Sequence, residues 1–278
     1  MSSASTTGSV PLPGSAVRRE WQRFTPGQRL ARFAVYLGIV AAVVVSIRTV
    51  EIIPEFLYDA PTQMMDLLER MWPVDTAHYK EGVHAALMET LHIATLGTLL
   101  SVLLALPLGL LAARNVTPVP LLNYAARLLL VASRSVNSLV WALLFIAIFG
   151  PGALAGMLAI AFRSIGFVGK LFGEACEEAN RGSIEALKAA GAPWLSVLRY
   201  GYWPQVKPAF WALVLLRWDI NVRESSVLGL VGAGGIGVAL NTAMNLFQWD
   251  RVATVLLAIF AVVIAAEILV TQIRKRLI

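Results

Sequence analysis

Long apolar stretches separated by short polar segments run through the chain from residue 33 to its end. A helix needs roughly 20 residues to cross about 30 Å of hydrocarbon. The pattern therefore predicts six transmembrane helices: Phe33–Ile53, Leu87–Ala113, Ala125–Phe149, Ala153–Phe172, Pro208–Val231 and Val252–Ile273. The third, fourth and fifth contain internal arginines, so their apolar signal is weaker than that of the other three.

The composition agrees with a membrane protein. Hydrophobic residues make up 58% of the 278 residues and charged residues only 14%, against about 45–50% and 25% in soluble proteins. Too few charges remain to cover a soluble surface of this size. The net charge of +6 does not indicate nucleic-acid binding, because the basic residues lie between apolar runs and not on one polar face. The predicted fold class is an all-α integral membrane protein that has the lipid bilayer as its solvent.

The charges between the apolar stretches predict the orientation. Most of the 23 Lys and Arg residues fall on one side when the N-terminus is placed in the cytoplasm, so both termini are expected to be cytoplasmic. The first thirty residues lack the apolar core and cleavage site of a signal peptide, so the first apolar helix is expected to be retained. The chain then divides into a basic cytoplasmic segment (1–32), the first transmembrane helix (33–53), an external acidic segment (54–86) and a core of five transmembrane helices (87–278).

The external segment contains an apolar stripe at helical spacing, formed by Met64, Leu67, Leu68, Met71 and Trp72. This pattern is typical of an amphipathic helix that lies on a membrane interface. A short lid packed on the helix bundle explains it equally well.

The longest internal cytoplasmic segment, residues 173–207, has a distinctive spacing. Glu185-Ala186-Leu187 is followed after three residues by Gly191, and after nine more by Gly201-Tyr202-Trp203-Pro204. We expect short helices over Ile184–Ala190 and Trp194–Tyr200, with a glycine-permitted bend between them. Such a knob is suited to a groove on a partner protein.

This spacing resembles the EAA loop of ABC importer permeases, although Leu187, Gly201 and Trp203 depart from its usual pattern. The stretch from Arg217 to Gly237, together with Arg134-Ser135 and Leu139–Leu143, is similar to the phosphonate-type permeases, which import phosphonate, phosphite or hypophosphite. The resemblance covers roughly Glu89 to Ile278. It implies a MetI-like type I importer architecture in which Glu185, Ala186, Gly191 and Pro204 contact an ATPase.

The resemblance also implies the partners and the location. A second copy of the chain would complete the pathway, and an external binding protein, periplasmic or lipid-anchored, would deliver the anion. Two separate ATPase subunits would hold ATP and Mg, since no Walker A motif occurs in this chain. The place implied is the bacterial plasma (inner) membrane.

Charged residues within the predicted helices are costly in a bilayer and are therefore candidates for function. Four arginines lie at membrane depth against Asp219 and Glu224, and a net positive cavity favours a small anion. We expect two polar faces to line the pathway: Arg134, Ser135, Asn137 and Ser138 on the third helix, and Arg217, Asn221, Arg223 and Ser225 on the fifth. An ion pair between Asp219 and Arg223, four residues apart, is the alternative for that part of the fifth helix.

The external loop, residues 232–250, spells G-x-G-x-x-G with Gly232, Gly234 and Gly237, and it also contains Gly235. A dinucleotide fingerprint needs a preceding strand, and here an apolar helix precedes. We expect a flexible outer loop that re-enters the membrane or meets the binding protein.

Neither catalytic residues nor a metal site are predicted. The three histidines, His78, His84 and His92, lack metal spacing, and the single cysteine, Cys176, excludes an intrachain disulfide. Two other classes of protein remain open: an intramembrane phosphate-handling enzyme, such as a lipid phosphatase, and a secondary anion transporter driven by an ion gradient.

Overall fold

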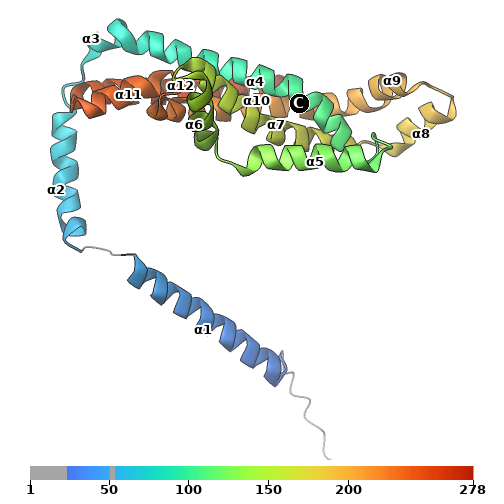
Figure 1. Ribbon diagram of the computed structural model, residues 1–278, viewed down its shortest axis with the longest axis horizontal. Helices are drawn as coiled ribbons and strands as arrows, with labels where there is room; N and C mark the ends of the chain where they lie inside the picture. The colour runs from blue at the N-terminus through green and yellow to red at the C-terminus, as the bar shows by residue number, and fades with distance from the viewer. Residues whose placement is uncertain (1–23, 51–53, 278) are drawn as a thin grey trace, which may run out of the picture. The chain divides into compact units, whose positions relative to one another are not determined.

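The computed structural model describes residues 24–50 and 54–277, and these are helical with connecting turns (Figure 1). They divide into two compact units between Thr62 and Gln63. The first unit contains α1 (Pro26–Thr49) and the start of α2 (Pro54–Arg70). The helix predicted over Phe33–Ile53 is present up to Thr49 and is long and apolar enough to cross a membrane, and residues 51–53 lie outside the described part. The helix begins seven residues earlier than predicted, with Pro26 in its first turn.

The predicted amphipathic helix corresponds to α2. Met64, Leu67 and Leu68 are exposed, as is Trp72, which follows the helix. An ion pair joins Arg70 to Asp66 at 2.7 Å on the helix surface. The helix thus presents an apolar stripe and charged residues together.

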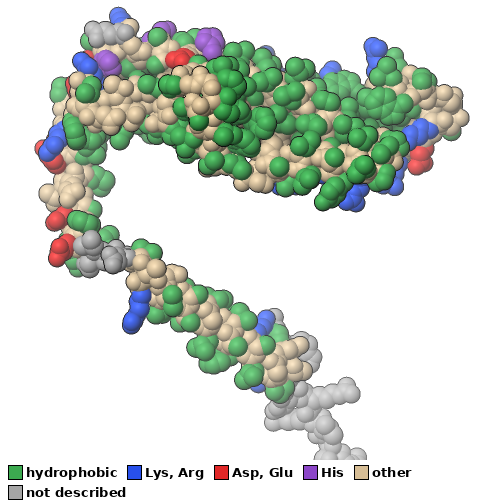
Figure 2. Space-filling view, in the orientation of Figure 1, with side chains coloured by type: hydrophobic (Ala, Val, Ile, Leu, Met, Phe, Trp, Pro, Cys, Tyr) green, Lys and Arg blue, Asp and Glu red, His purple; other side chains and the backbone are tan. Residues whose placement is uncertain are grey.

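The second unit is a bundle of long helices with short ones at its ends. Its elements in chain order are α3 (Thr76–His78), η1 (Tyr79–Val83), α4 (His84–Ala112), α5 (Pro120–Ser135), α6 (Ser138–Phe149), α7 (Ala153–Glu178), α8 (Arg181–Ala189), α9 (Trp194–Ser196), η2 (Val197–Tyr202), α10 (Trp203–Leu228), η3 (Gly229–Val231), α11 (Ile236–Asn245) and α12 (Trp249–Leu277). Helix α7 is central, because it packs against α4, α5, α6 and α10. Hydrophobic side chains cover the middle of the bundle, and Lys and Arg gather near α8 and α9 at one end (Figure 2).

Small residues allow α7 to approach its neighbours closely, as is common between membrane helices. A Cβ atom on Gly166 would lie 2.3 Å from the Leu130 carbonyl oxygen of α5. A Cβ on Gly109 of α4 would lie 2.7 Å from the Gly169 carbonyl oxygen of α7. Both contacts are impossible for a real side chain, so the helix spacing depends on these glycines.

The third predicted transmembrane helix is not continuous, and this prediction was wrong. It is broken into α5 and α6, which meet at an angle of 91°. The break has a local cause: Val136 is extended, and the Asn137 side chain accepts a hydrogen bond from the Leu139 amide at 3.2 Å. Asn137 is thereby the N-cap of a second helix, α6. The apolar pattern of the sequence does not show where one helix ends and the next begins.

Four described helices are long and apolar enough to cross a membrane, namely α1, α4, α7 and α12. Two bent pairs reach the same length: α5 with α6, and residues 194–231 with α11, the second bent by 40°. The count of six agrees with the prediction if each bent pair is one span. The predicted span Pro208–Val231 falls within α10 and η3, and the predicted external loop 232–250 contains α11, a helix that the sequence pattern did not predict.

Candidate functional site

Two arginines and one glutamate form ion pairs between α7 and α10, and the Cβ of a third arginine, on α5, lies beside Gly166 of α7. We call Arg134, Arg163, Arg217 and Glu224 the arginine cluster. Glu224 forms ion pairs with both Arg163 of α7 and Arg217 of its own helix, the latter at 3.4 Å between Nη2 and Oε2. Arg217 and Glu224 are two helical turns apart on α10 and so share a face. One carboxylate thus serves two guanidinium groups, which leaves a surplus positive charge.

A chain of hydrogen bonds holds Arg217 in place. Its Nε donates to the Ser164 hydroxyl at 2.8 Å, and Ser164 donates to the Asn221 side-chain oxygen at 3.2 Å. The Asn221 amide then donates to the Thr98 hydroxyl of α4 at 2.7 Å. Ser164 and Asn221 are fully buried, and Arg217 is only 3% exposed. Each polar group along this chain is satisfied, which makes a buried arginine tolerable.

The predicted face of the third helix lies at the corner between α5 and α6. Arg134, Ser135 and Asn137 are exposed there, and Ser138 is buried. A Cβ on Gly166 would lie 3.1 Å from the Arg134 Cβ. The Cβ of Arg134 therefore packs against α7 at Gly166, which is one helical turn from Arg163. Arg134 forms no ion pair with another described residue.

The predicted residues of the fifth helix lie in two different environments. Arg217, Asn221 and Ser225 are buried against α4 and α7, and the Ser225 hydroxyl donates to the Thr90 carbonyl oxygen at 2.9 Å. Arg223 is exposed and forms an ion pair with Asp219, four residues before it, as the alternative interpretation expected. One Asp219 carboxylate oxygen is buried without a hydrogen-bond partner.

The sequence does not reveal the partner of Glu224 on α7. Arg163 and Glu224 are 61 residues apart, and no sequence signal connects them. The spacing of Arg217 and Glu224 is visible in the sequence, but the supporting Ser164 and Thr98 are recognisable only from the packing of α4, α7 and α10.

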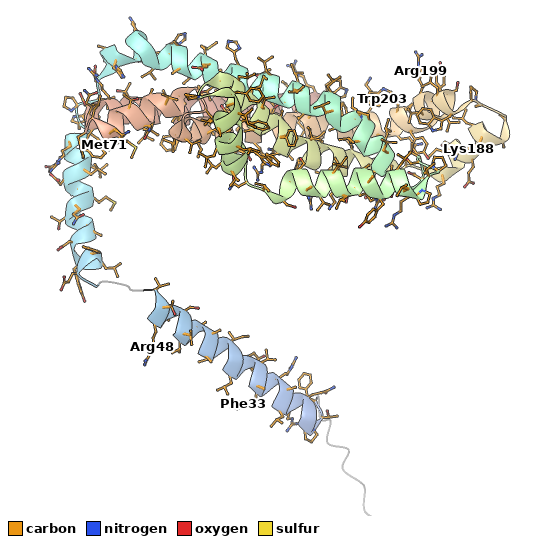
Figure 3. All side chains as sticks on the ribbon, viewed as in Figure 1. Phe33, Arg48, Met71, Lys188, Arg199 and Trp203 are labelled. Carbon is orange, nitrogen blue, oxygen red and sulfur yellow. The ribbon has the colours of Figure 1, made fainter. Side chains whose placement is uncertain are left out.

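The coupling segment, residues 180–204, forms a knob at one end of the bundle (Figure 3, near Lys188, Arg199 and Trp203). The first expected short helix is present as α8, but the second, expected to end at Tyr200, runs without a break through α9 and η2 into α10. Helix α8 ends before Gly191, whose φ of +74° is rarely adopted by other residues. Glu185, Ala186 and Pro204 are exposed, as is Gly191 itself. The knob thus presents all four predicted coupling residues on its surface.

The knob is anchored to the bundle by buried contacts. Ile184 and Val197 join an apolar cluster with Phe172 and Phe210 from the long helices. The Tyr202 hydroxyl donates to the Asn115 carbonyl oxygen at 3.2 Å, in the link between α4 and α5. Movement of the knob would therefore reach the long helices directly.

The glycine-rich turn is tightly packed, in contrast to the predicted flexible loop. Gly232, Gly234 and Gly235 have φ values of +90°, +82° and +75°, and a Cβ on Gly237 would lie 2.2 Å from the Ser226 carbonyl oxygen. The Ile236 amide, in the first turn of α11, donates to the Thr90 hydroxyl of α4 at 2.7 Å. Close backbone contacts with α4, α7 and α10 explain why glycine is required, and they fix the turn in place.

Replacing Thr90 by valine is expected to loosen this turn. The Ile236 amide would lose its partner in a buried place, at a cost of about 1–3 kcal/mol. We expect a lower melting temperature and faster hydrogen exchange at residues 232–237. Thr242→Val removes an exposed hydroxyl from α11 and serves as the control. Equal exchange in the two variants would contradict the assigned role of Thr90.

The described residues hold no cluster of three or more His, Cys, Asp or Glu side chains that suits a metal ion. The G-x-G-x-x-G sequence follows helices α10 and η3 and not a strand, so the dinucleotide fingerprint lacks its structural context.

The bundle contains helices that are long and apolar enough to cross a membrane, a knob at one end and ion pairs between its helices. Residues 105–278 match the family described as "Binding-protein-dependent transport system inner membrane component", and the chain belongs to this family. The family implies a multi-pass membrane protein with ATPase and substrate-binding partners. The predicted recognition as an ABC importer permease is confirmed.

Two similar proteins are named as permeases for phosphorus compounds. The chain is 40% identical over 203 residues to the phosphite transport system permease protein PtxC of Stutzerimonas stutzeri, covering 73% of this chain and 74% of that protein. It is 38% identical over 240 residues to the phosphate-import permease protein PhnE of Mycolicibacterium smegmatis, covering 85% of this chain and 44% of that longer protein. Both relatives are named as transport permeases.

Two solved structures share the fold. One is described as an amino acid ABC transporter with histidines, with 19% identity, 72% of this chain and 96% of that chain covered, and a TM-score of 0.61. The other is the MetNI methionine ABC transporter in an inward-facing conformation, with 20% identity, 70% and 96% coverage and a TM-score of 0.63. The predicted all-α, MetI-like permease fold is confirmed.

Proposed function

We propose that this chain is the transmembrane permease subunit of an ATP-driven importer for phosphonate or a related small phosphorus oxyanion. Phosphite, hypophosphite and phosphate esters belong to the same class. The observation that carries the proposal is the 40% identity, over about three quarters of both chains, to a phosphite permease. The exposed Arg134 and the surplus charge of the arginine cluster support an anionic substrate.

Two copies of the chain enclose the pathway, an external binding protein delivers the anion, and two ATPase subunits bind ATP and Mg. The coupling segment supports the ATPase contact, since Glu185, Ala186, Gly191 and Pro204 are exposed on a knob that is anchored to the bundle. Closure of the ATPases moves the knob, and the knob shifts the long helices. The glycine-rich turn, with Gly232, Gly234, Gly235 and Gly237, marks the end of the bundle that is proposed to face the binding protein. Gly234, Gly235 and Gly237 are themselves buried, so they fix the turn in place and do not form the contact surface.

The pathway residues divide by exposure. Arg134, Ser135, Asn137 and Arg223 are accessible to an anion. Arg217, Asn221, Ser225 and Ser138 are buried, so they make no direct contact with the anion in this conformation. Arg217 contributes a positive charge, and Asn221 and Ser225 support the packing through their hydrogen bonds to α4. A guanidinium fork is suited to the oxygens of a phosphorus oxyanion.

Gentle purification of the chain from its native membrane tests the proposed class. We expect a near-stoichiometric ATPase to accompany it, and ATP hydrolysis by the complex to rise when the loaded binding protein is added. A chain that purifies alone and hydrolyses a phosphate ester would instead support the intramembrane enzyme. Uptake that follows an ion gradient without ATP would support the secondary transporter.

Replacing Arg134 by alanine is expected to reduce uptake by about 10- to 150-fold, because a charge-assisted contact to the anion is worth about 1.5–3 kcal/mol. Uptake of phosphite or methylphosphonate by vesicles containing the assembled importer measures the effect. Arg48→Ala, in the last turn of α1, is the control with the same change of charge. Normal uptake by a folded Arg134→Ala importer would remove Arg134 from the pathway.

A further inference from the structure

We propose that Arg163 and Glu224 form an anion-exchange site, in which Glu224 occupies the Arg163 guanidinium until the transported anion displaces it. This inference rests on the proposed function and assigns a role to two residues outside the predicted pathway. Glu224 would then act as an internal counterion that keeps the affinity for the substrate low enough for release.

The two arginines bound by Glu224 differ in their freedom to move. The Arg217 side chain is 4% exposed and is held by Ser164, so it stays in place. The Arg163 side chain is 31% exposed, and its only ion pair among the described residues is with Glu224. Arg163 is therefore the member of the pair that an entering anion can reach.

Glu224 retains a partner when Arg163 leaves it. Its second oxygen contacts Arg217 at 3.4 Å, so the carboxylate remains neutralised during the exchange. Stranding a buried charge costs several kcal/mol, and the shared arrangement avoids that cost. If Glu224 were paired with Arg163 alone, the exchange would leave its carboxylate without a positive partner.

Arg134 completes the site from the neighbouring helix. It is exposed and starts one turn from Arg163 along α7, as the Gly166 contact shows. In the proposed exchange, an anion held by the exposed Arg134 passes to the Arg163 guanidinium, which Glu224 orients. The planar fork of a guanidinium matches the several oxygens of a phosphorus oxyanion and not a compact monovalent anion such as chloride.

Two neutralising variants with opposite expected effects test the proposal. In the assembled importer without ATP, Arg163→Gln should weaken methylphosphonate binding about tenfold, since one charged contact to the anion is lost. Glu224→Gln should tighten binding about tenfold, because the competing carboxylate is gone, and it should slow ATP-driven uptake. Glu174→Gln, which removes an exposed carboxylate paired with Lys170 on α7, is the matched control.

The direction of the changes decides the outcome. A purely structural ion pair predicts that both variants weaken binding and lower the melting temperature together, and that result would overturn the exchange site. Unchanged binding in Arg163→Gln would overturn it as well. This variant keeps the ion pair between Glu224 and Arg217, so it tests the proposal even if Glu224→Gln does not fold. If the unaltered importer neither binds nor transports a phosphorus oxyanion, the proposed function itself is wrong. If it does both and only the two variants behave otherwise than expected, the exchange site alone is wrong.

Discussion

Replacing Gly166 by alanine is expected to lower the melting temperature of the purified chain by about 5–10 °C, because overpacking a close contact costs about 1–3 kcal/mol or more. The new Cβ would lie 2.3 Å from the Leu130 carbonyl oxygen and 3.0 Å from the Ser133 hydroxyl. Neither group can yield easily, since Leu130 is in the middle of α5 and Ser133 accepts a hydrogen bond from the Gly166 amide at 3.1 Å. Helices α5 and α7 would have to separate.

This separation should reach the candidate site. Arg134 follows Ser133 directly, and the same helix contact places its Cβ beside Gly166, one turn from Arg163 on α7. We therefore expect Gly166→Ala to lose uptake as well as stability. Gly38→Ala is the matched control, because a Cβ at Gly38 of α1 meets nothing within 4 Å and alanine favours a helix. Equal melting temperatures for the two variants would show that α5 and α7 do not approach as described.

Replacing Gly191 by valine is expected to abolish import and to reduce the association with the ATPase at least tenfold, a change of about 1.4 kcal/mol or more. Gly191 has a φ of +74° and links α8 to α9, so a β-branched residue would distort the bend. A Cβ atom at this position would meet nothing within 4 Å, so the strain arises from the backbone and not from a clash. Binding of the anion to the helix bundle should be little affected.

Pull-down of the ATPase with the tagged chain, together with uptake by vesicles, measures the two effects. The control is Gly38→Ala on α1, which lies outside the coupling segment and has nothing within 4 Å of the added Cβ. An intact ATPase complex with normal uptake in Gly191→Val would exclude the knob as the coupling element.

The long helices were predictable from the sequence because lipid requires an apolar run of a given length. Helices α4, α7 and α12 begin or end within a few residues of the prediction, except that α7 continues six residues further to Glu178. The break between α5 and α6 was not predictable, since it depends on one asparagine cap inside an apolar run. The packed glycine turn was mistaken for a flexible loop, because glycine permits both freedom and close contact and only the neighbouring helices decide between them.

The candidate site was predictable in its residue types but not in its pairing. Buried arginines and acidic residues were visible in the sequence, and the Asp219–Arg223 pair follows from helical spacing alone. The contact of Arg163 with Glu224 joins two helices, and no local pattern encodes the distance between them. The bend at Gly191 was predictable, because glycine acts on the backbone locally, whereas the continuation of the second helix into α10 was not.

The most direct test of the account is uptake by vesicles that contain this chain, its ATPase and its binding protein. Radiolabelled phosphite or methylphosphonate is added outside, and ATP with Mg is sealed inside. We predict accumulation that requires ATP and the binding protein and is lost in Gly191→Val. Accumulation without ATP, or no accumulation of any phosphorus oxyanion by the assembled complex, would contradict the assignment as an ATP-driven permease for this class of anion.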